Sequence, residues 1–545
     1  MDTAARPVKR QRATKACDFC HARGRKCAPR SQQGSECATC ADFGVACTWN
    51  RVAKRRGAKP QPGKGLARWI LNDEKHGQRE VIELLIDTYF QQVYPVVNVV
   101  FERSYREKWQ ARDTPNSQPS FALLMSICAL SAFRFHDTGS LRRDHASSNI
   151  NPDLYLEEAL AAIPTEVPHM RTIEMLQAIG LICVTALERR MAPLLHKMFG
   201  TYHAALADQG FCDEKQWKAD LSPIEREERR RLFWYMYRLE VHTSLVMGHV
   251  VRCPDLQSHV GYPTVRDEEI TASGHMSEWL TGWNFVTDLY RGMEHLITRF
   301  RLSRSPQASE GRLVRTDFIS NDHLAHQILE QVLSGYELLP DRFKNTSSFS
   351  DPRNERCAFQ HANIVCTMLL VEMLALTANN ATLLAACQTA HTLIDKISFI
   401  PPQFLRAMSL GMLQELSGFG QILSSFIGKD MSRSEYTKLR IVMLSMAELL
   451  ENLDDSLASA GQAAQKLRNH VHDIDQFLQD RKQGRKPVPA EPPAVSPLLN
   501  QIPVVPVMTE ADLDPMMSIP IEYFQEIPWP GAEWYGTEGL EGIYA

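Results

Sequence analysis

Six cysteines lie within the first 50 residues, and their spacing repeats. They are Cys17, Cys20, Cys27, Cys37, Cys40 and Cys47, which gives the pattern C-x2-C-x6-C-x9-C-x2-C-x6-C. The unit C-x2-C-x6-C occurs twice, so the spacing indicates two similar half-sites related by a pseudo-twofold axis. Few apolar side chains lie between these cysteines, so a module of about 30 residues needs a bound metal to organise it.

Thiolates at this density suit zinc, which takes four ligands in a tetrahedron. Six cysteines can hold one zinc with two thiols to spare, or two zincs if two thiolates bridge the ions, and the repeated unit favours two. A single-zinc site could also use His21 in place of a cysteine. A disulfide knot needs an oxidising compartment that nothing in the sequence indicates. A C-x-x-C redox pair is typically surrounded by a βαβ pattern, which is absent around these cysteines.

The charge of the chain is divided unevenly between its two ends. Residues 1–65 contain fifteen Lys and Arg against four Asp and Glu, whereas residues 487–545 contain nine acidic residues and no Lys or Arg. A basic head favours polyanionic partners, and an acidic tail favours basic or apolar protein surfaces.

Neither a secretory signal nor a membrane span is evident. The start, MDTAARPVKRQR, is basic and lacks an apolar core. No segment reaches the ~18 apolar residues that a membrane span needs, and residues 121–133 are the nearest. We therefore expect an intracellular protein without a membrane partner.

The cysteine segment resembles the fungal binuclear zinc-cluster transcription regulators. Their signature is this six-cysteine spacing with a basic run between the second and third cysteines. The resemblance implies two zinc ions per chain, with Cys17 and Cys37 bridging them. The remaining ligands would be Cys20 and Cys27 on one zinc, and Cys40 and Cys47 on the other. The resemblance also implies a nuclear protein that binds double-stranded DNA and regulates genes of RNA polymerase II.

In this family a short helix beginning at the second cysteine enters the major groove and reads CGG-type triplets. The family more often has basic residues at both the Arg23 and Gly24 positions, so Gly24 is a departure. Because Arg pairs with guanine O6 and N7, we expect Arg23 to read bases, and Arg25 and Lys26 to contact phosphates or to substitute for it. The basic linker after the last cysteine would add phosphate affinity. Its contacting residues would be Arg51, Lys54, Arg55 and Arg56.

The middle of the chain has helical periodicity almost throughout, without convincing strand alternation or a tandem repeat. In residues 221–240, Ser222-Pro223 is a helix start signal. The predicted buried stripe of this helix is Leu232, Phe233, Met236 and Leu239. On its exposed side we expect the i,i+4 ion pairs Glu225–Arg229 and Glu227–Arg231.

This region also resembles the fungal-specific regulatory domain that accompanies such zinc clusters, which is an all-α bundle. The pieces that carry the resemblance are residues 89–101, 205–212, 222–240 and 387–397. The resemblance leaves open a homodimer, and a small-molecule inducer or a repressor protein bound to the helical domain. No coiled coil follows the basic linker to support dimerisation by that route.

We expect no enzyme. The chain has no glycine-rich phosphate loop, no G-x-S-x-G and no H-E-x-x-H motif. The spacing of His242, His249 and Cys253 fits no metal-ligand pattern. The seven cysteines outside the cluster are scattered singly in apolar contexts, as buried structural thiols usually are.

The C-terminal segment changes composition twice. Residues 487–506 contain seven prolines and predict a stiff, extended linker. Residues 508–545 interleave eight acidic residues with aromatic ones, which is typical of activation segments whose aromatics enter a coactivator groove. We expect Phe524, Trp529 and Trp534 to make those contacts. The alternative is a tail that docks on its own helical domain.

The sequence therefore predicts a mainly α protein in six parts. They are a disordered basic N-terminus (1–14), a binuclear zinc-cluster DNA-binding domain (15–50), a basic linker (51–79), an all-α regulatory domain (80–482), a proline-rich linker (483–507) and an acidic-aromatic activation tail (508–545). The predicted function is a sequence-specific transcription activator of a metabolic pathway or biosynthetic gene cluster. The alternative is a co-regulator that acts through a partner because Gly24 weakens DNA binding by its zinc module.

Overall fold

The chain divides into two compact units, Met1–Arg68 and Trp69–Ala545, which are described separately. The computed structural model describes residues 16–27, 36–50, 69–113, 115–137, 150–264, 278–303, 323–345, 349, 355–378, 382–401, 403–405, 432–453 and 460–482. Within these ranges every named element is a helix, and an isolated bridge joins Asp213 to His259. The prediction of a mainly α chain is confirmed.

The first unit contains two five-residue helices, α1 (Asp18–Ala22) and α2 (Ala38–Asp42). Its buried centre consists of cysteines rather than of aliphatic side chains. Phe19 and Val45 are partly buried against that centre. A small unit with such a centre has the composition of modules that fold around a bound metal.

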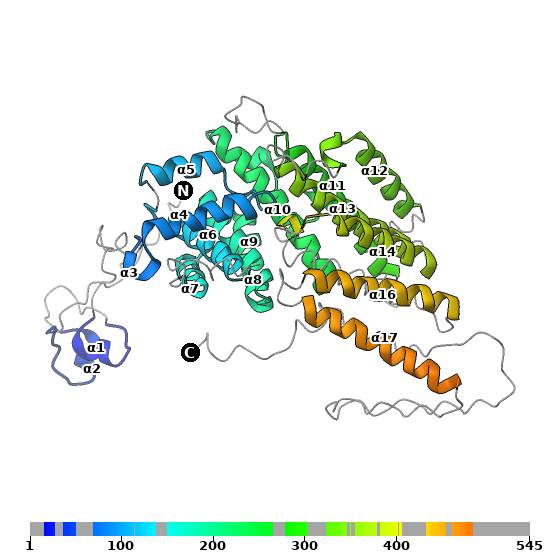
Figure 1. The fold of residues 1–545 in the computed structure, drawn as a ribbon. Coiled ribbons are helices and arrows are strands. Elements are labelled where there is room, and N and C mark those ends of the chain that lie inside the picture. The colour runs from blue at the N-terminus through cyan, green and yellow to red at the C-terminus, as the bar shows by residue number, and fades with distance from the viewer. Residues whose placement is uncertain are drawn as a thin grey trace, which may run out of the picture. The chain divides into compact units, whose positions relative to one another are not determined.

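The second unit is a stack of helices (Figure 1). Its longer helices are α4 (Arg79–Thr88), α5 (Glu102–Gln110), α6 (Gln118–Asp137), α7 (Pro152–Ala162), α8 (Ile173–Glu188), α9 (Ala192–Asp208), α10 (Pro223–Met247), α11 (Leu280–Ser303), α12 (Leu324–Leu338), α13 (Glu355–Ala378), α14 (Leu383–Ser398), α16 (Arg433–Leu453) and α17 (Ala460–Lys482). The shorter elements are α3 (Asp73–His76), the π-helix η2 (Tyr89–Val93) and the 3-10 turns η5 (Val167–His169), η6 (Glu214–Gln216), η7 (Asp255–Gln257) and η10 (Asp341–Phe343).

The helices pack in an order that follows the chain. Helix α6 contacts α4, α7 and α8, and α8 contacts α9. Helix α10 packs against both α8 and α11, so it joins the earlier helices to the later ones. The packing then continues from α11 to α13, from α13 to α12 and α14, and through α16 to α17. One hydrophobic core runs through this unit.

Helix α10 begins where the sequence predicts. The hydroxyl of Ser222 accepts a hydrogen bond from the backbone N–H of Glu225 at 3.1 Å, and Pro223 opens the first turn. Gly248, with φ of +76°, follows the last helical residue. The predicted apolar stripe is buried, as expected. The residues that start this helix and those that form its apolar face can therefore be identified from the local sequence.

The ion pairs of α10 form, but their predicted exposure is wrong. Arg229 lies 3.1 Å from Glu225, and Arg231 lies 3.2 Å from Glu227, with both arginines buried. Arg231 is only 1% exposed and also donates to the hydroxyl of Tyr94 at 2.9 Å. A buried charge is tolerated when it is paired and hydrogen-bonded, and the central position of α10 supplies those partners.

Two helices are long and apolar enough to cross a membrane by length and composition, contrary to the sequence prediction. The windows are Gln118–Phe135 in α6 and Glu355–Ala378 in α13. In each window 78% of the residues are buried inside the fold. Core helices of compact proteins meet the same criteria, so these two helices are weak evidence for a membrane span.

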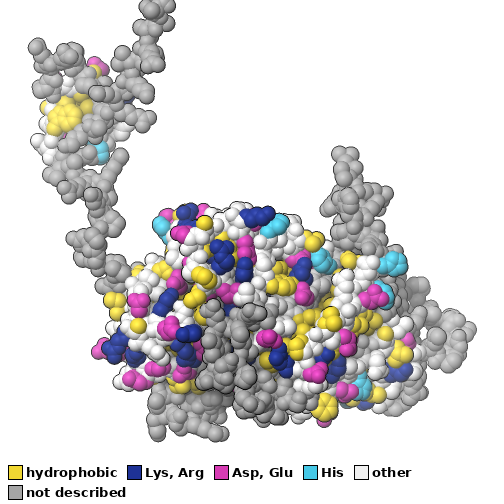
Figure 2. All heavy atoms as spheres, turned by 90° about the horizontal axis from the view of Figure 1, so that it is seen from above, with side chains coloured by type: hydrophobic (Ala, Val, Ile, Leu, Met, Phe, Trp, Pro, Cys, Tyr) yellow, Lys and Arg dark blue, Asp and Glu magenta, His cyan; other side chains and the backbone are white. Residues whose placement is uncertain are grey.

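The surface of the helical unit mixes charges of both signs. In Figure 2 the dark blue Lys and Arg side chains are interspersed with magenta Asp and Glu over the face in view. Among the described side chains in this view, Lys and Arg form no continuous basic patch of the kind that nucleic-acid binding favours.

Candidate metal centre and nucleic-acid interface

The two helices of the first unit place their cysteines in the same way. Cys17 is the residue before α1 and Cys37 the residue before α2, and each helix carries a second cysteine, Cys20 or Cys40, at its third residue. These four thiols are buried, and their sulfur atoms all lie within 4.8 Å of one another. Among the residues that the structure describes, no other group of three or more His, Cys, Asp or Glu side chains is arranged to hold a metal.

The sulfur spacing matches that of zinc ligands. Cys17 Sγ lies 3.7 Å from Cys37 Sγ and 3.5 Å from Cys40 Sγ, and Cys20 Sγ lies 3.6 Å from Cys37 Sγ. Zinc–sulfur bonds of about 2.3 Å in a tetrahedron place neighbouring sulfur atoms about 3.8 Å apart. The donor set and its dimensions therefore fit zinc.

Cys27 and Cys47 lie beside this cluster but are half-buried. The sulfur of Cys47 accepts a hydrogen bond from the backbone N–H of Cys37 at 3.4 Å. The four closest thiols are the expected bridging pair, Cys17 and Cys37, together with one terminal ligand from each half, Cys20 and Cys40. This arrangement fits a single zinc bound by all four thiols as well as the centre of a two-zinc cluster. The number of zinc ions bound per chain distinguishes these two arrangements.

The thiols of the cluster are not equivalent electrostatically. The backbone amide of Cys20 lowers the pKa of Cys17 to about 6, and the backbone amide of Cys40 lowers the pKa of Cys37. Burial raises the pKa of Cys20 to about 12 and also raises that of Cys40. The cysteine before each helix is thus the one whose thiolate the backbone favours.

Each helix ends in a left-handed glycine. Gly24 after α1 and Gly44 after α2 both have φ of +61°. Arg25 N–H donates to the carbonyl of Cys20 at 2.9 Å, and Val45 N–H donates to that of Cys40 at 3.1 Å. This is the helix-ending pattern that glycine favours. Gly24, a departure from the family pattern, therefore has a conformational role, and its counterpart Gly44 has the same one.

Three predicted DNA-contacting side chains, Arg23, Arg25 and Lys26, are exposed on one short segment. The guanidinium of Arg23 lies 5.2 Å from the ring centre of Phe19, and that of Arg25 lies 4.7 Å from that of Phe43. The two rings also contact each other, with 5.9 Å between centres. The aromatic rings therefore help to orient the two guanidinium groups, and both arginine side chains stay exposed to solvent.

Neither Phe19 nor Phe43 was predicted as a site residue. The four-residue spacing of Phe19 and Arg23 could have indicated this contact, because residues four apart are neighbours on the surface of a helix.

Two side-chain hydrogen bonds also hold the segments of the first unit together. Thr39 Oγ1 donates to the carbonyl of Lys26 at 2.8 Å, and Thr48 Oγ1 donates to Asp18 at 2.9 Å.

Seven predicted site residues lie outside the described residues. They are Arg51, Lys54, Arg55 and Arg56 of the basic linker and Phe524, Trp529 and Trp534 of the tail. Their predicted roles stay predictions.

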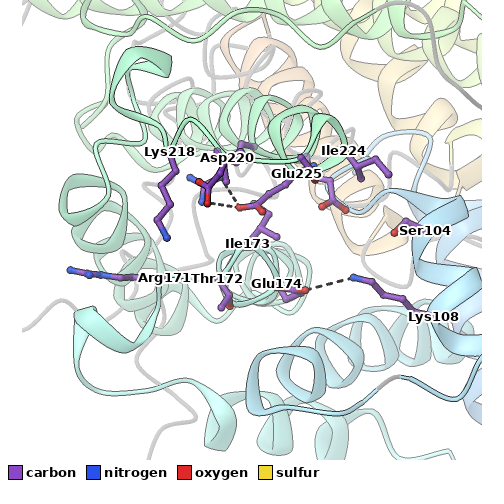
Figure 3. A pocket seen from close by; sticks show the side chains of 14 residues that line it. Ser104, Lys108, Arg171, Thr172, Ile173, Glu174, Lys218, Asp220, Ile224 and Glu225 are labelled. Carbon is purple, nitrogen blue, oxygen red and sulfur yellow. Dashed lines mark hydrogen bonds and ion pairs between the residues drawn. The ribbon is translucent and has the colours of Figure 1, made fainter.

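A cavity of about 450 Å³ lies in the helical unit, between the starts of α8 and α10 (Figure 3). Lys108 and Glu174 form an ion pair of 3.8 Å in its wall, and Arg229 pairs with Glu225 at 3.1 Å. Small-molecule sites are lined mainly by apolar and aromatic side chains. The charges of this cavity largely pair with one another, so it offers little support for a bound inducer.

His242, His249 and Cys253 do not form a metal site. His249 Nε2 lies 2.9 Å from Thr243 Oγ1, and Cys253 lies beside Cys212, with 3.6 Å between their sulfur atoms. The prediction that the cysteines of the helical unit are scattered singly is therefore wrong for one pair. Cys212 and Cys253 are half-buried, whereas the other cysteines of that unit are buried.

Residues 86–291 match a family model described as "Fungal specific transcription factor domain". The chain is also 26% identical over 230 residues to "Transcription factor yanR" of Aspergillus niger, a match that covers 36% of this chain and 27% of that protein. The chain thus matches only about a quarter of that relative's length. No solved structure matches the chain. The family match and the similarity to this relative both support a fungal transcription regulator, and they indicate a regulatory, non-enzymatic protein.

The family match is narrower than the resemblance suggested. It runs from α4 into α11 and contains three of the four resembling pieces, 89–101, 205–212 and 222–240. Residues 387–397 in α14 lie outside it. The cysteine cluster also lies outside it, so the evidence for a metal there is the geometry of the thiols.

Proposed function

We propose that this chain is a nuclear, sequence-specific DNA-binding transcription activator whose N-terminal unit is a two-zinc cluster. The observation that carries the proposal is the buried four-thiol cluster at the N-terminal ends of α1 and α2. The exposed basic residues Arg23, Arg25 and Lys26 follow α1 directly in the chain. The family match of residues 86–291 supports the regulatory part of the proposal.

Zinc would act here as a structural cross-link. Cys17 and Cys37 contact each other, and each also contacts a second thiol of the opposite half, Cys40 for Cys17 and Cys20 for Cys37, which supports their role as bridging ligands. The remaining four cysteines would complete two tetrahedra, as the repeated spacing implies. Because aliphatic packing in the module is slight, zinc binding and folding should be one event.

The exposed arginines have the chemistry for guanine recognition. A guanidinium donates two parallel hydrogen bonds to O6 and N7 in the major groove. Stacking on Phe19 and Phe43 restricts Arg23 and Arg25 before DNA arrives, which reduces the entropy lost on binding. Arg23, the residue directly after the last residue of α1, is the proposed base reader.

The alternative function is a co-regulator that binds DNA weakly and acts through a partner. Gly24 favours it, because the family's second basic position has no side chain here. The φ of +61° at Gly24 shows that the backbone has adopted a conformation that suits glycine. The side chain that would make one of the two expected base contacts is therefore absent.

Selection of binding sites from random duplexes, using the zinc-loaded full-length chain, separates the two functions. The proposal expects enrichment of a CGG-type triplet that is lost in Cys37→Ala. Enrichment of no motif, together with intact zinc content, supports the co-regulator. Nuclear location and coactivator contacts through the tail belong to the same proposal, and homodimerisation can be read from the spacing of any paired triplets.

A further inference from the structure

Two cysteines of the helical unit lie in contact although 41 residues separate them. The sulfur atoms of Cys212 and Cys253 are 3.6 Å apart, and both side chains are half-buried. Cys212 follows α9, and Cys253 lies between α10 and η7. The backbones of their segments are joined nearby, since His259 N–H donates to the carbonyl of Cys212 at 2.8 Å.

This pair lacks the features of a metal site. A zinc site needs at least three protein ligands. In the described residues the only cluster with that many suitable side chains is the one at α1 and α2. Cys212 and Cys253 therefore stand as an isolated dithiol, in which a disulfide requires the sulfur atoms to move from 3.6 Å to about 2.05 Å apart.

Cys212 also has physical features that favour reaction with an oxidant. The neighbouring thiol of Cys253 lowers the pKa of Cys212, which increases its thiolate fraction. By contrast, burial raises the pKa of Cys357 and of Cys387 to about 11. Partial exposure adds access for a small oxidant.

We propose that Cys212 and Cys253 are a site of reversible disulfide formation, driven by hydrogen peroxide or another peroxide. The Cys212 thiolate attacks one peroxide oxygen, which breaks the O–O bond and leaves a sulfenic acid and water. The Cys253 thiol then attacks that sulfur and displaces a second water. Two thiols lose two electrons and two hydrogens in total, and one hydrogen peroxide becomes two waters.

The disulfide would cross-link a segment that already contacts several other elements. Residues 251–264, here called the strap, contact α10 through Arg252 and Glu240 at 2.8 Å. The strap contacts α11 through Asp255 and Arg291 at 2.6 Å. Gly261 N–H donates to Glu214 at 2.7 Å, in the segment that follows Cys212. A disulfide therefore adds a covalent link between the ends of a loop that contains α10.

The test uses the full-length, zinc-loaded chain treated with hydrogen peroxide, digested with trypsin and measured by mass spectrometry without reduction. The expected product is peptide 198–215 linked to peptide 253–266, with the loss of two hydrogens and reversal by dithiothreitol. Cys212→Ser and Cys253→Ser should abolish the link, whereas Cys357→Ser should leave it intact. The disulfide should raise the melting temperature of the helical unit by about 5 °C.

Three results would overturn the proposal. The first is oxidation of Cys212 to sulfinic acid without any linked peptide. The second is a link from Cys212 or Cys253 to a cysteine of the zinc module in place of their own link. The third is equal peroxide sensitivity of Cys357 and Cys212, which would show that the contact confers no reactivity. None of these results depends on whether the chain binds DNA.

Discussion

The sulfur atoms of Cys17 and Cys37 lie 3.7 Å apart, although 20 residues separate them in the chain. Each is also in contact with the thiol of the other half-site, Cys17 with Cys40 and Cys37 with Cys20. The two residues that precede the helices therefore occupy the middle of the cluster. A thiolate in that position can bind two metal ions at once as a bridging ligand.

The first prediction concerns the number of zinc ions. The wild-type chain should bind two per molecule by elemental analysis or native mass spectrometry. Cys37→Ala should lose both, because it removes a shared ligand, and Cys27→Ala should lose one. Cys357→Ala, in the helical unit, is the matched control and should keep two. One zinc per chain, unchanged by Cys27→Ala, would instead establish a single site at Cys17, Cys20, Cys37 and Cys40.

The second prediction uses the shared φ of +61° at Gly24 and Gly44. A Cβ at either position would meet no atom within 4 Å, so a substitution there is strained but not blocked. Gly24→Lys and Gly44→Lys should each lower the free energy of unfolding by about 1–2 kcal/mol. Only Gly24→Lys should also tighten binding to the preferred triplet. Equal gains in DNA affinity for both variants would mean that added charge alone is responsible.

The third prediction separates base contacts from phosphate contacts. Arg23→Ala should cost ~1–3 kcal/mol on the preferred site and relax the triplet preference, because it removes a base-reading group. Lys54→Ala should weaken binding to all sequences alike and reduce the salt dependence of the affinity. Titrations on matched and scrambled duplexes at several salt concentrations measure both effects. A uniform loss of affinity in both variants would make Arg23 a phosphate contact.

The fourth prediction tests the packing of the helical unit at two glycines. A Cβ at Gly282 in α11 would lie 2.7 Å from Phe343 and 2.8 Å from Gln360, whereas one at Gly200 in α9 would meet nothing within 4 Å. Gly282→Ala should therefore destabilise the unit by ~1–3 kcal/mol through overpacking. Gly200→Ala should stabilise it by ~0.5–1 kcal/mol, because alanine favours the helix. Urea denaturation followed by circular dichroism measures both, and similar effects of the two changes would contradict the observed packing.

The features that could be predicted from sequence are local ones. The repeat C-x2-C-x6-C indicated two equivalent metal-binding segments, and the structure places a short helix after the first cysteine of each. Ser222-Pro223 marked the start of α10 because capping depends on a few neighbouring residues. These signals require no knowledge of distant parts of the chain.

The features that could not be predicted depend on distant partners. Arg231 looked exposed because its i,i+4 partner Glu227 was visible in the sequence, whereas Tyr94, which also contacts it, lies 137 residues away. The contact of Cys212 with Cys253 depends in the same way on how α9 and the strap meet. Periodicity identifies the faces of a helix, but it does not show which helices lie at the centre of the stack.

The last prediction concerns the tail, whose residues lie outside the described ranges. Fused to an unrelated DNA-binding domain, residues 508–545 should activate a reporter alone. Replacement of Phe524, Trp529 and Trp534 by Ala should abolish that activity, because buried aromatics supply most of the binding energy in such contacts. Changing two of its acids to amides should only reduce it, since charge mainly promotes solubility and encounter. If the fused tail is silent while its deletion makes the full chain constitutively active, the tail inhibits the protein.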